Sequence, residues 1–258
     1  MKGVRRLAAV ERWIWCPDRR PGARLQLLCF PHAGGTPAVF RHWAGELPAD
    51  VELLAARLPG RQSRLTEPAY RDWVALLAEL SAVVATAIDR PFALFGHSLG
   101  AMICYELART LRAVRPARLL LAACRAPDVP SPLPPVHRLP DVELARGLPL
   151  VARIPPEVLA DPRMMRLVLP TIRADLTLTE SWPPTRPTPL GVPATVFVGR
   201  ADPVAPPSSA RGWSRFAAPV RVAVLDGDHF FVHSDRTFVH HVRAELARLS
   251  IVARPPPR

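Results

Sequence analysis

The chain has 258 residues, of which 49% are apolar, so it is long enough for one sizeable α/β domain with a packed core and is not a disordered protein. Its apolar runs fall short of the roughly 20 residues that a membrane-spanning helix needs, and the run LAAV near the start is too short for a signal peptide, so we expect a cytoplasmic protein. The net charge of +12 comes almost entirely from arginine, but no basic run or nucleic-acid-binding motif accompanies it, which argues against DNA or RNA as a partner.

Six short apolar segments predict β-strands. They are 25–30, 51–57, 91–96, 117–124, 194–200 and 220–226. Several are continuous apolar runs rather than alternating ones, which is typical of parallel strands buried on both faces. Longer helical patterns separate them, so the sequence predicts an α/β fold with a mostly parallel central sheet flanked by helices.

Three helical patterns accompany these strands. Residues 70–89 carry apolar side chains at spacings of three and four, and a second pattern runs from Gly100 to about Arg112. The last covers 234–249, with Ser234 as its N-cap.

One region between the fourth and fifth predicted strands departs from this alternation. From 126 to 191 no strand is predicted, prolines cluster at both edges, and helical patterns lie between them. A span of about 65 residues is far longer than an ordinary loop. We therefore interpret 126–191 as a helical lid inserted into an α/β core made of 1–125 and 192–258. A crossover elaborated with extra helices is the alternative.

The four cysteines, Cys16, Cys29, Cys104 and Cys124, contain no C-x-x-C pair. Cys29 and Cys124 end apolar runs and Cys104 falls in a helical pattern, so we interpret them as buried free thiols in a reducing compartment. No residues supply clustered ligands at zinc-site spacing, and we expect no metal ion.

The segment Gly96-His97-Ser98-Leu99-Gly100 matches the G-x-S-x-G nucleophile elbow of the α/β-hydrolase fold. An apolar strand precedes it and a helical pattern follows, which is the context that the motif requires. A strand that turns at once into a helix strains the serine backbone and brings neighbouring segments close, so both glycines have a steric reason. We predict Ser98 as the nucleophile. We interpret His97 as structural, because adjacent residues on a sharp turn point in different directions.

A serine hydroxyl needs a histidine base, which is itself oriented by a carboxylate. In the α/β-hydrolase fold the acid and then the histidine follow the nucleophile, on loops after later strands. Asp202 follows the predicted strand 194–200 and His229 follows 220–226, so both fall at the sheet edge that carries Ser98. These three residues are the predicted triad.

Other candidates for the acid and the base fit less well. Asp128 follows the fourth predicted strand, a position that some hydrolases use, but it lies in a proline-rich loop. Asp226 and Asp228 are too close to His229 in the chain to orient its ring. The remaining candidate histidines, His233, His240 and His241, lie on or beside the last predicted helix.

An oxyanion hole requires backbone N–H groups aimed at the charge that develops on the carbonyl oxygen. One donor is expected from Leu99, the residue after the nucleophile, and the other from the loop after the first predicted strand. That loop contains Pro31-His32-Ala33-Gly34-Gly35, whose glycines let the backbone approach the site closely. We choose the N–H of Ala33.

These segments together resemble the type II thioesterases that accompany polyketide and nonribosomal peptide synthetases. The resemblance runs over nearly the whole chain and rests on CFPHAGG (29–35), LPGRQSR (58–64), FGHSLGA (95–101), HRLPDVEL (137–144), LPTIRADLTLTE (169–180), GRADPV (199–204) and LDGDHFF (225–231). It implies the same triad and the same two oxyanion donors that the residues themselves indicate.

The resemblance implies hydrolysis of acyl groups from the phosphopantetheine arm of acyl or peptidyl carrier proteins, to edit stalled chains or to release product. It also implies that the lid shapes an acyl channel. The candidate lining residues are Met164, Met165, Leu167, Leu176 and Trp182, with plain core packing as the alternative for each. No cofactor beyond the carrier's own arm is required, and we expect a monomer.

Two other functions stay open from the sequence. An esterase or lipase acting on small free esters would use the same triad, and a non-catalytic hydrolase-fold protein would bind a ligand or partner without turnover. The intact Ser98, Asp202 and His229 argue against the second. The 34 basic against 22 acidic residues fit docking to an acidic carrier and a composition bias equally well.

Overall fold

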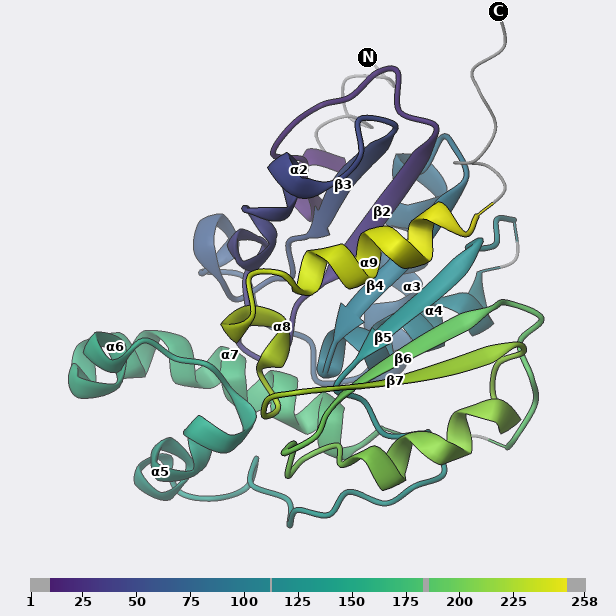
Figure 1. Cartoon of the computed structure of the whole chain (residues 1–258). Helices are drawn as coiled ribbons and strands as arrows, with labels where there is room; N and C mark the ends of the chain where they lie inside the picture. Colours follow the sequence, from purple (N-terminus) through teal and green to yellow (C-terminus); the bar gives the residue numbers. More distant parts are fainter. Residues whose placement is uncertain (1–9, 112, 183–185, 250–258) are drawn as a thin grey trace, which may run out of the picture.

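The computed structural model describes residues 10–111, 113–182 and 186–249. Its centre is a seven-stranded sheet in the order β1-β3-β2-β4-β5-β6-β7 (Figure 1). The strands are β1 (Ile14–Trp15), β2 (Leu25–Phe30), β3 (Val51–Ala56), β4 (Phe92–His97), β5 (Arg118–Ala122), β6 (Ala194–Gly199) and β7 (Val220–Leu225). All neighbours pair in parallel except β1, which is antiparallel to β3. The six predicted strands are present; β1 is missing from the prediction because two residues are too few to show a pattern.

Helices connect the strands and complete the predicted α/β architecture. They are α2 (Trp43–Glu46), α3 (Trp73–Ala87), α4 (Leu99–Thr110), α5 (Asp141–Val151), α6 (Pro156–Ala160), α7 (Pro162–Glu180), α8 (Phe231–Ser234) and α9 (Phe238–Ala247), with 3-10 helices η1 (Pro37–Phe40), η2 (Gln62–Arg64) and η3 (Pro207–Arg215). Within the described residues, no helix combines the length and the apolar character that crossing a membrane requires.

The C-terminal helical region corrects one prediction. The sequence predicts a single helix over 234–249 capped by Ser234, but Ser234 instead ends α8, and α9 begins at Phe238. Asp235 Oδ1 accepts hydrogen bonds from the backbone N–H and the hydroxyl of Thr237, at 2.8 and 2.7 Å. This local turn competes with helical hydrogen bonding and separates the two helices.

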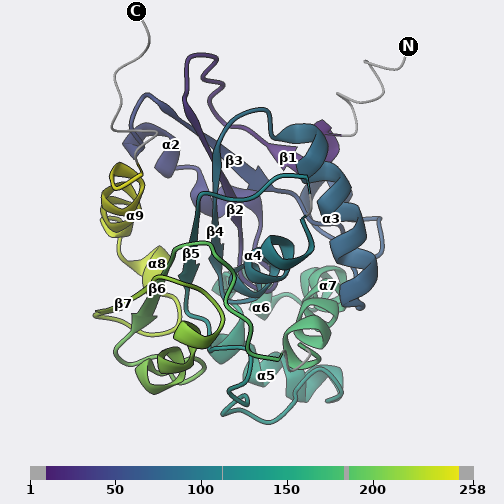
Figure 2. The same ribbon diagram turned by 90° about the vertical axis from the view of Figure 1, so that its right-hand side faces the viewer.

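Two apolar cores cover the two faces of the sheet. Alternate residues of a strand go to opposite cores; on β4, Leu94 packs in one and Phe95 in the other. Figure 2 shows α3 and α4 on one side of the sheet and α9 on the other. Burial on both faces explains why the central strands are continuous apolar runs in the sequence.

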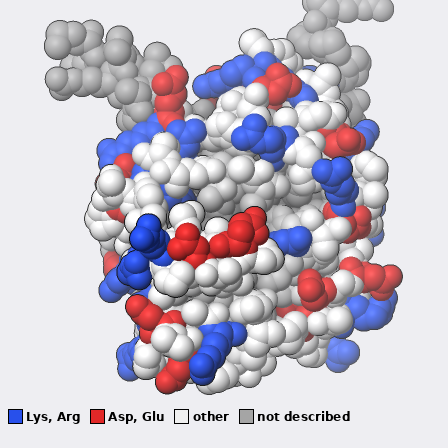
Figure 3. Space-filling view, turned by 90° about the vertical axis from the view of Figure 1, so that its left-hand side faces the viewer, with Lys and Arg blue, Asp and Glu red and all other residues white. Residues whose placement is uncertain are grey.

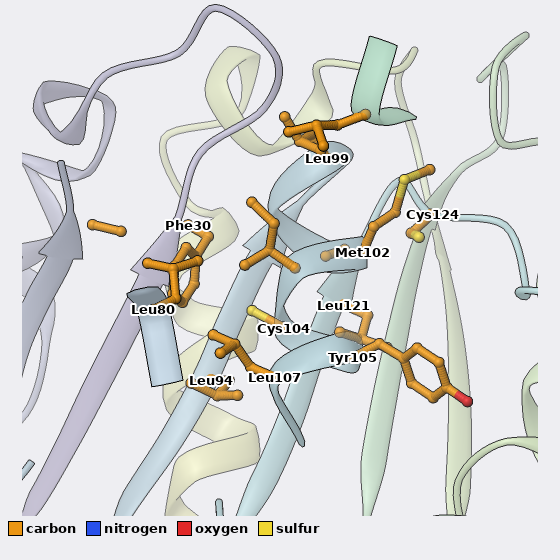
Figure 4. Close-up of a cluster of buried hydrophobic side chains, with 14 of the residues drawn as sticks. Phe30, Leu80, Leu94, Leu99, Met102, Cys104, Tyr105, Leu107, Leu121 and Cys124 are labelled. Atoms are coloured by element: carbon orange, nitrogen blue, oxygen red, sulfur yellow. The ribbon is translucent and has the colours of Figure 1, made fainter. Parts of the chain in front are cut away.

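Helix α4 is almost wholly enclosed by the sheet and by α3. Ten of its twelve residues are buried. In Figure 4, Cys104 and Leu107 of α4 lie near Leu94 of β4, and Leu80 of α3 lies beside Phe30 of β2. Such a helix cannot shift without opening the core, so the residue at its N-terminus is held in a fixed place.

Helices α5, α6 and α7 lie between β5 and β6 in the sequence and beyond one end of the sheet in space (Figure 1). The described residues of 126–191 contain no strand. Leu144 and Leu148 on α5 are fully buried. Arg173 on α7 donates hydrogen bonds to the backbone carbonyls of His137 and Leu139, before α5. The inserted segment is therefore joined to itself by hydrogen bonds as well as packed on the core.

Replacing Gly100 by alanine should strongly destabilise the fold. A Cβ atom there would lie 2.1 Å from the carbonyl oxygen of Phe30, which is backbone and has no room to yield. We expect a loss of at least about 3 kcal/mol in the free energy of unfolding, measured by chemical denaturation.

Gly147 in α5 is the matched control, because a Cβ atom there would meet nothing within 4 Å. Gly147→Ala should stabilise the protein by about 0.5–1 kcal/mol, the ordinary gain from alanine inside a helix. A Gly100→Ala protein as stable as Gly147→Ala would contradict the close approach of α4 to β2.

Candidate active site

Ser98 lies in the turn between β4 and α4 with φ 55° and ψ −116°. A positive φ is unfavourable for a residue with a Cβ atom and costs about 1–3 kcal/mol. The Ser98 N–H donates to the carbonyl of Ala122 on β5 at 2.9 Å, and a Cβ on Gly96 or Gly100 would come within 2.2 Å of backbone atoms. The surrounding backbone thus holds the serine in the strained conformation of a nucleophile elbow.

The side chains of Ser98, His229 and Asp202 form one chain of hydrogen bonds. Ser98 Oγ lies 3.0 Å from His229 Nε2, and His229 Nδ1 lies 3.0 and 2.9 Å from the two carboxylate oxygens of Asp202. All three residues are buried. An ionised carboxylate only accepts, so the imidazole proton is on Nδ1 and Nε2 is free to accept the serine proton.

The loop after β6 fixes the carboxylate of Asp202. Its Oδ1 also accepts hydrogen bonds from the backbone N–H groups of Val204 and Ala205, at 2.7 and 2.9 Å. These bonds compensate for the burial of the carboxylate and aim it at the imidazole of His229.

The other candidate acids are engaged elsewhere. Asp128 and Asp226 pair with arginine side chains, at 2.6 and 3.0 Å. Asp228 Oδ1 accepts from the backbone N–H of Phe230 at 2.8 Å. Of the acids considered from the sequence, the structure brings Asp202 to the ring of His229.

Two backbone N–H groups lie at the nucleophile or at its cavity. Leu99 is the first residue of α4, where N–H groups have no partner inside the helix. Ala33 follows β2 and lines the same cavity as Ser98 and His229. Within the part of the chain that the structure describes, neither N–H donates a hydrogen bond, so both are available to charge that develops on a substrate oxygen.

A buried ion pair joins the Ala33 loop to helix α7. Arg61 donates to both carboxylate oxygens of Asp175 at 2.8 Å and to the Gly35 carbonyl at 3.0 Å. Asp175 Oδ2 also accepts from the Gly34 N–H at 2.7 Å. Because these glycines directly follow Ala33, helix α7 fixes the course of the predicted oxyanion loop.

Sequence reasoning assigns no role to Arg61 or Asp175. The sequence signal that could have revealed this pair is on α7, where Asp175 falls on the same buried face as Ile172 and Leu176. An acid inside an apolar stripe implies a buried partner. The partner itself lies 114 residues away and cannot be identified from spacing.

The cavity at Ser98 is small. Its volume is about 50 Å³, and it is bounded by Ala33 and His229 on the core side and by residues 131–136 and α7 on the lid side. A water molecule takes up about 30 Å³ in the liquid, so this conformation admits only a small group. We expect a longer chain to bind after the wall formed by residues 131–136 moves outward.

Leu176 is the one predicted channel residue that lines this cavity within the described residues. Met164 and Leu167 are 41% and 53% exposed on α7. Met165 and Trp182 belong to the hydrophobic core. In this conformation, Met164, Met165 and Leu167 on α7 and Trp182 beyond its end do not line the cavity at Ser98.

Three further histidines, His32, His97 and His233, pack behind His229. Their ring centroids lie 4.9 to 5.3 Å apart. Burial lowers the pKa of His32 to about 4 and that of His233 to about 2, and it lowers the pKa of His97 well below its ordinary value. All three rings are therefore neutral at pH 7. The sequence shows no clustered metal ligands, but the fold gathers these three from distant parts of the chain.

The parallel sheet, the strained elbow and the positions of Asp202 and His229 after β6 and β7 are those of the α/β-hydrolase fold. The chain also matches the family model of the thioesterase domain over residues 25–246. It belongs to the thioesterase family.

Individual relatives agree with this family. The chain is 34% identical over 233 residues to linear gramicidin dehydrogenase LgrE of Brevibacillus parabrevis, with 88% of this chain and 89% of that protein covered. RedJ, a thioesterase from the prodiginine biosynthetic pathway in Streptomyces coelicolor, superposes with a TM-score of 0.80 at 32% identity over 88% of this chain and 92% of its own. The type II thioesterase BorB from the borrelidin biosynthetic cluster gives 0.80 at 31% identity over 91% and 97%. The word dehydrogenase belongs to the name of LgrE; the family match and the site of this chain are those of a thioesterase.

Replacing Asp175 by asparagine should both destabilise the protein and slow it. Removing one partner leaves the buried Arg61 guanidinium without its counter-charge, which costs about 3–5 kcal/mol. The Gly34 N–H loses its anionic acceptor, so the Ala33 loop shifts and kcat should fall more than KM rises. Urea denaturation and steady-state kinetics measure the two effects.

Asp141→Asn is the matched control on the same lid. Asp141 also pairs with an arginine, Arg173, but its side chain is 75% exposed. Exposed pairs contribute little, so we expect a change within about 0.5 kcal/mol and an unaltered kcat. Equal effects of the two substitutions would show that the Arg61–Asp175 pair does not position the loop.

Proposed function

We propose that this chain is a serine thioesterase that hydrolyses acyl thioesters from the phosphopantetheine arm of carrier proteins, editing or releasing chains in polyketide or nonribosomal peptide biosynthesis. The observation that carries the proposal is the hydrogen-bonded chain Ser98–His229–Asp202, which opens into a cavity beside two unpaired N–H groups. The thioesterase family and the biosynthetic settings of RedJ and BorB support the substrate class.

In the first half-reaction, Ser98 Oγ attacks the thioester carbonyl carbon while its proton passes to His229 Nε2. Asp202 stabilises the imidazolium that forms. The N–H groups of Ala33 and Leu99 bind the oxygen that becomes negatively charged. Collapse of the tetrahedral intermediate breaks the C–S bond, and the thiol of the arm leaves with the proton from His229.

Water completes the cycle through the same groups. His229 Nε2 takes a proton from water as the water oxygen attacks the acyl-Ser98 ester. When this second intermediate collapses, Ser98 Oγ regains a proton from His229 and the free carboxylic acid departs. A thiolate leaves more readily than an amine, so protonation of the leaving group is less demanding than in a protease.

The lid side of the cavity provides the surface for the acyl group. It carries the apolar side chains of Leu133, Val136 and Leu176. The segment 131–136 is joined to α7 where Glu180 accepts hydrogen bonds from the N–H groups of Val136 and His137. The Arg61–Asp175 pair holds α7 on the core. We therefore infer that the cavity widens by movement of the segment 131–136.

Substitution of the triad tests the proposal. Ser98→Ala should abolish both hydrolysis of an acyl-loaded carrier protein and labelling by a fluorophosphonate, with the fold intact, because it removes the only proposed attacking group. Asp202→Asn should lower kcat by about three to four orders of magnitude, because the anion that orients and stabilises the imidazolium is lost. Mass spectrometry of the carrier protein follows the acyl group directly.

The same assay separates the competing functions when one acyl group is presented on a carrier protein, on a small thiol and as a simple ester. Preference for the ester would identify an esterase. A wild-type protein that neither turns over nor reacts with the probe would identify a binding protein. Comparable turnover by a folded Ser98→Ala protein would place the nucleophile elsewhere.

Carrier proteins are the proposed partners, and charge is one means of attracting them. On the face shown in Figure 3, Lys and Arg are interspersed with Asp and Glu rather than gathered in one basic patch. On this face, an attraction to an acidic carrier would therefore come from the net charge of +12 acting at long range.

Salt should weaken this attraction. The Debye length falls from about 10 Å at 0.1 M to about 3 Å at 1 M ionic strength. We expect kcat/KM for a carrier-bound substrate to fall as salt rises, whereas the same acyl group on a small uncharged thiol should show little change. Equal salt responses of the two substrates would attribute the arginine excess to composition bias.

A further inference from the structure

Half of the eight histidines of the chain gather in one place. Besides His229 these are His32, on the loop after β2, His97, at the end of β4, and His233, on α8. One ring nitrogen of each of His32, His97 and His233 lies within 4.8 Å of those of the other two. His97 Nδ1 and His233 Nε2 are 3.0 Å apart.

Backbone carbonyls orient two of these rings. His32 Nδ1 lies 2.8 Å from the carbonyl oxygen of Ala33, and His97 Nε2 lies 2.8 Å from that of His229. A carbonyl only accepts, so both of these nitrogens carry protons, and Nε2 of His32 keeps its lone pair. Nδ1 of His97 then accepts a hydrogen bond from Nε2 of His233, and zinc would replace this hydrogen bond as the His233 proton moves to Nδ1. Histidine ligands of metals are oriented in this way, with the second ring nitrogen donating to a carbonyl or carboxylate.

The surroundings allow a metal ion to reach the three rings. His32 and His97 are buried and His233 is partly buried, so the cluster is shielded from water on most sides. His32 and His233 line a surface pocket of about 520 Å³, which gives an entry path. Arg153 and Arg236 line the same pocket and are exposed. Their charges favour an anion, such as hydroxide or chloride, as a fourth ligand.

We propose that His32, His97 and His233 bind one zinc ion, and that the bound ion inhibits hydrolysis. Neutral imidazoles suit zinc, and three of them with one exchangeable ligand make a tetrahedral site. At Zn–N distances of about 2.0–2.1 Å the three nitrogens lie about 3.3 Å from one another. His97 Nδ1 and His233 Nε2 are already 3.0 Å apart, so zinc binding draws mainly His32 inward, within a cluster whose nitrogens lie up to 4.8 Å apart in this structure.

The contraction explains the inhibition. His32 is hydrogen-bonded to the carbonyl of Ala33, so drawing its ring toward His97 and His233 moves the backbone of Ala33. A displacement of about 1 Å in a site of this kind costs about 100-fold in rate. This effect on activity rests on the proposed function, but zinc binding itself does not.

Zinc binding is measured on the metal-free full-length chain by calorimetry, and the ligand set by the visible spectrum of bound Co²⁺. We expect one equivalent of zinc and a tetrahedral cobalt spectrum. His233→Ala and His233→Gln should each weaken zinc binding by at least about 100-fold, with a folded protein verified by thermal unfolding. His240→Ala is the matched control, since His240 is 56% exposed on α9, and it should bind zinc as the wild type does.

Activity is then measured with and without zinc. Zinc should slow the wild type and His240→Ala, a chelator should restore them, and both His233 variants should be insensitive. Ser98→Ala, which is expected to be inactive, should still bind zinc, so failure of the proposed function is distinguished from failure of this site. Unchanged zinc affinity in the His233 variants, an equal loss in His240→Ala, or zinc binding without inhibition would overturn the proposal.

Discussion

The close contact between α4 and the end of β2 is the constraint on which the rest of the site depends. Gly100 lies so near the carbonyls of Phe30 and Pro31 that a Cβ atom there would come within 2.7 Å of both. The contact lets the chain turn from β4 into α4 at Ser98. It also places the loop that begins at Pro31 beside that turn, so one missing side chain brings the strained serine and the Ala33 N–H together.

Buried polar contacts then fix segments that apolar packing alone leaves less well oriented. Arg61 and Asp175 join the loop after β3, the Ala33 loop and α7 by hydrogen bonds of defined direction. His97 joins the elbow to the backbone of His229. Burying such groups is costly unless each is paired, and these are paired. A hydrogen bond fixes the direction of an N–H group or an imidazole ring, whereas van der Waals contacts allow a wider range of angles.

The sequence allowed the fold and the centre of the site to be predicted, because both leave local signals. Continuous apolar runs indicate strands that are buried on both faces, and the two glycines around Ser98 indicate a nucleophile elbow. Asp202 and His229 could be placed because parallel strands all end at one edge of the sheet, so position after a strand predicts position in space.

Other features of the structure were predicted wrongly or not at all. They depend on contacts between distant segments of the chain, or on a local turn that competes with a helix. The Arg61–Asp175 pair and the cluster of His32, His97 and His233 form only when loops far apart in the chain meet. The break before α9 depends on the side chain of Asp235 outcompeting a helical turn, which the apolar periodicity does not report. The channel residues stay a prediction from apolar character, which does not distinguish cavity from core; in this conformation Leu176 lines the cavity at Ser98.

The segment between β5 and β6 contains an anchored helix and a less anchored wall, and this division bears on how one site could serve many acyl chains. The core side of the cavity holds the groups that act on the carbonyl, and α7 is anchored there through Asp175. The opposite wall, 131–136, is joined to α7 by hydrogen bonds to Glu180. If this wall yields while α7 stays in place, the acyl group can vary in size without disturbing the positions of Ser98, His229 and the two N–H groups. With the proposed function, accommodation on one wall and chemistry on the other would keep the rate independent of the acyl chain.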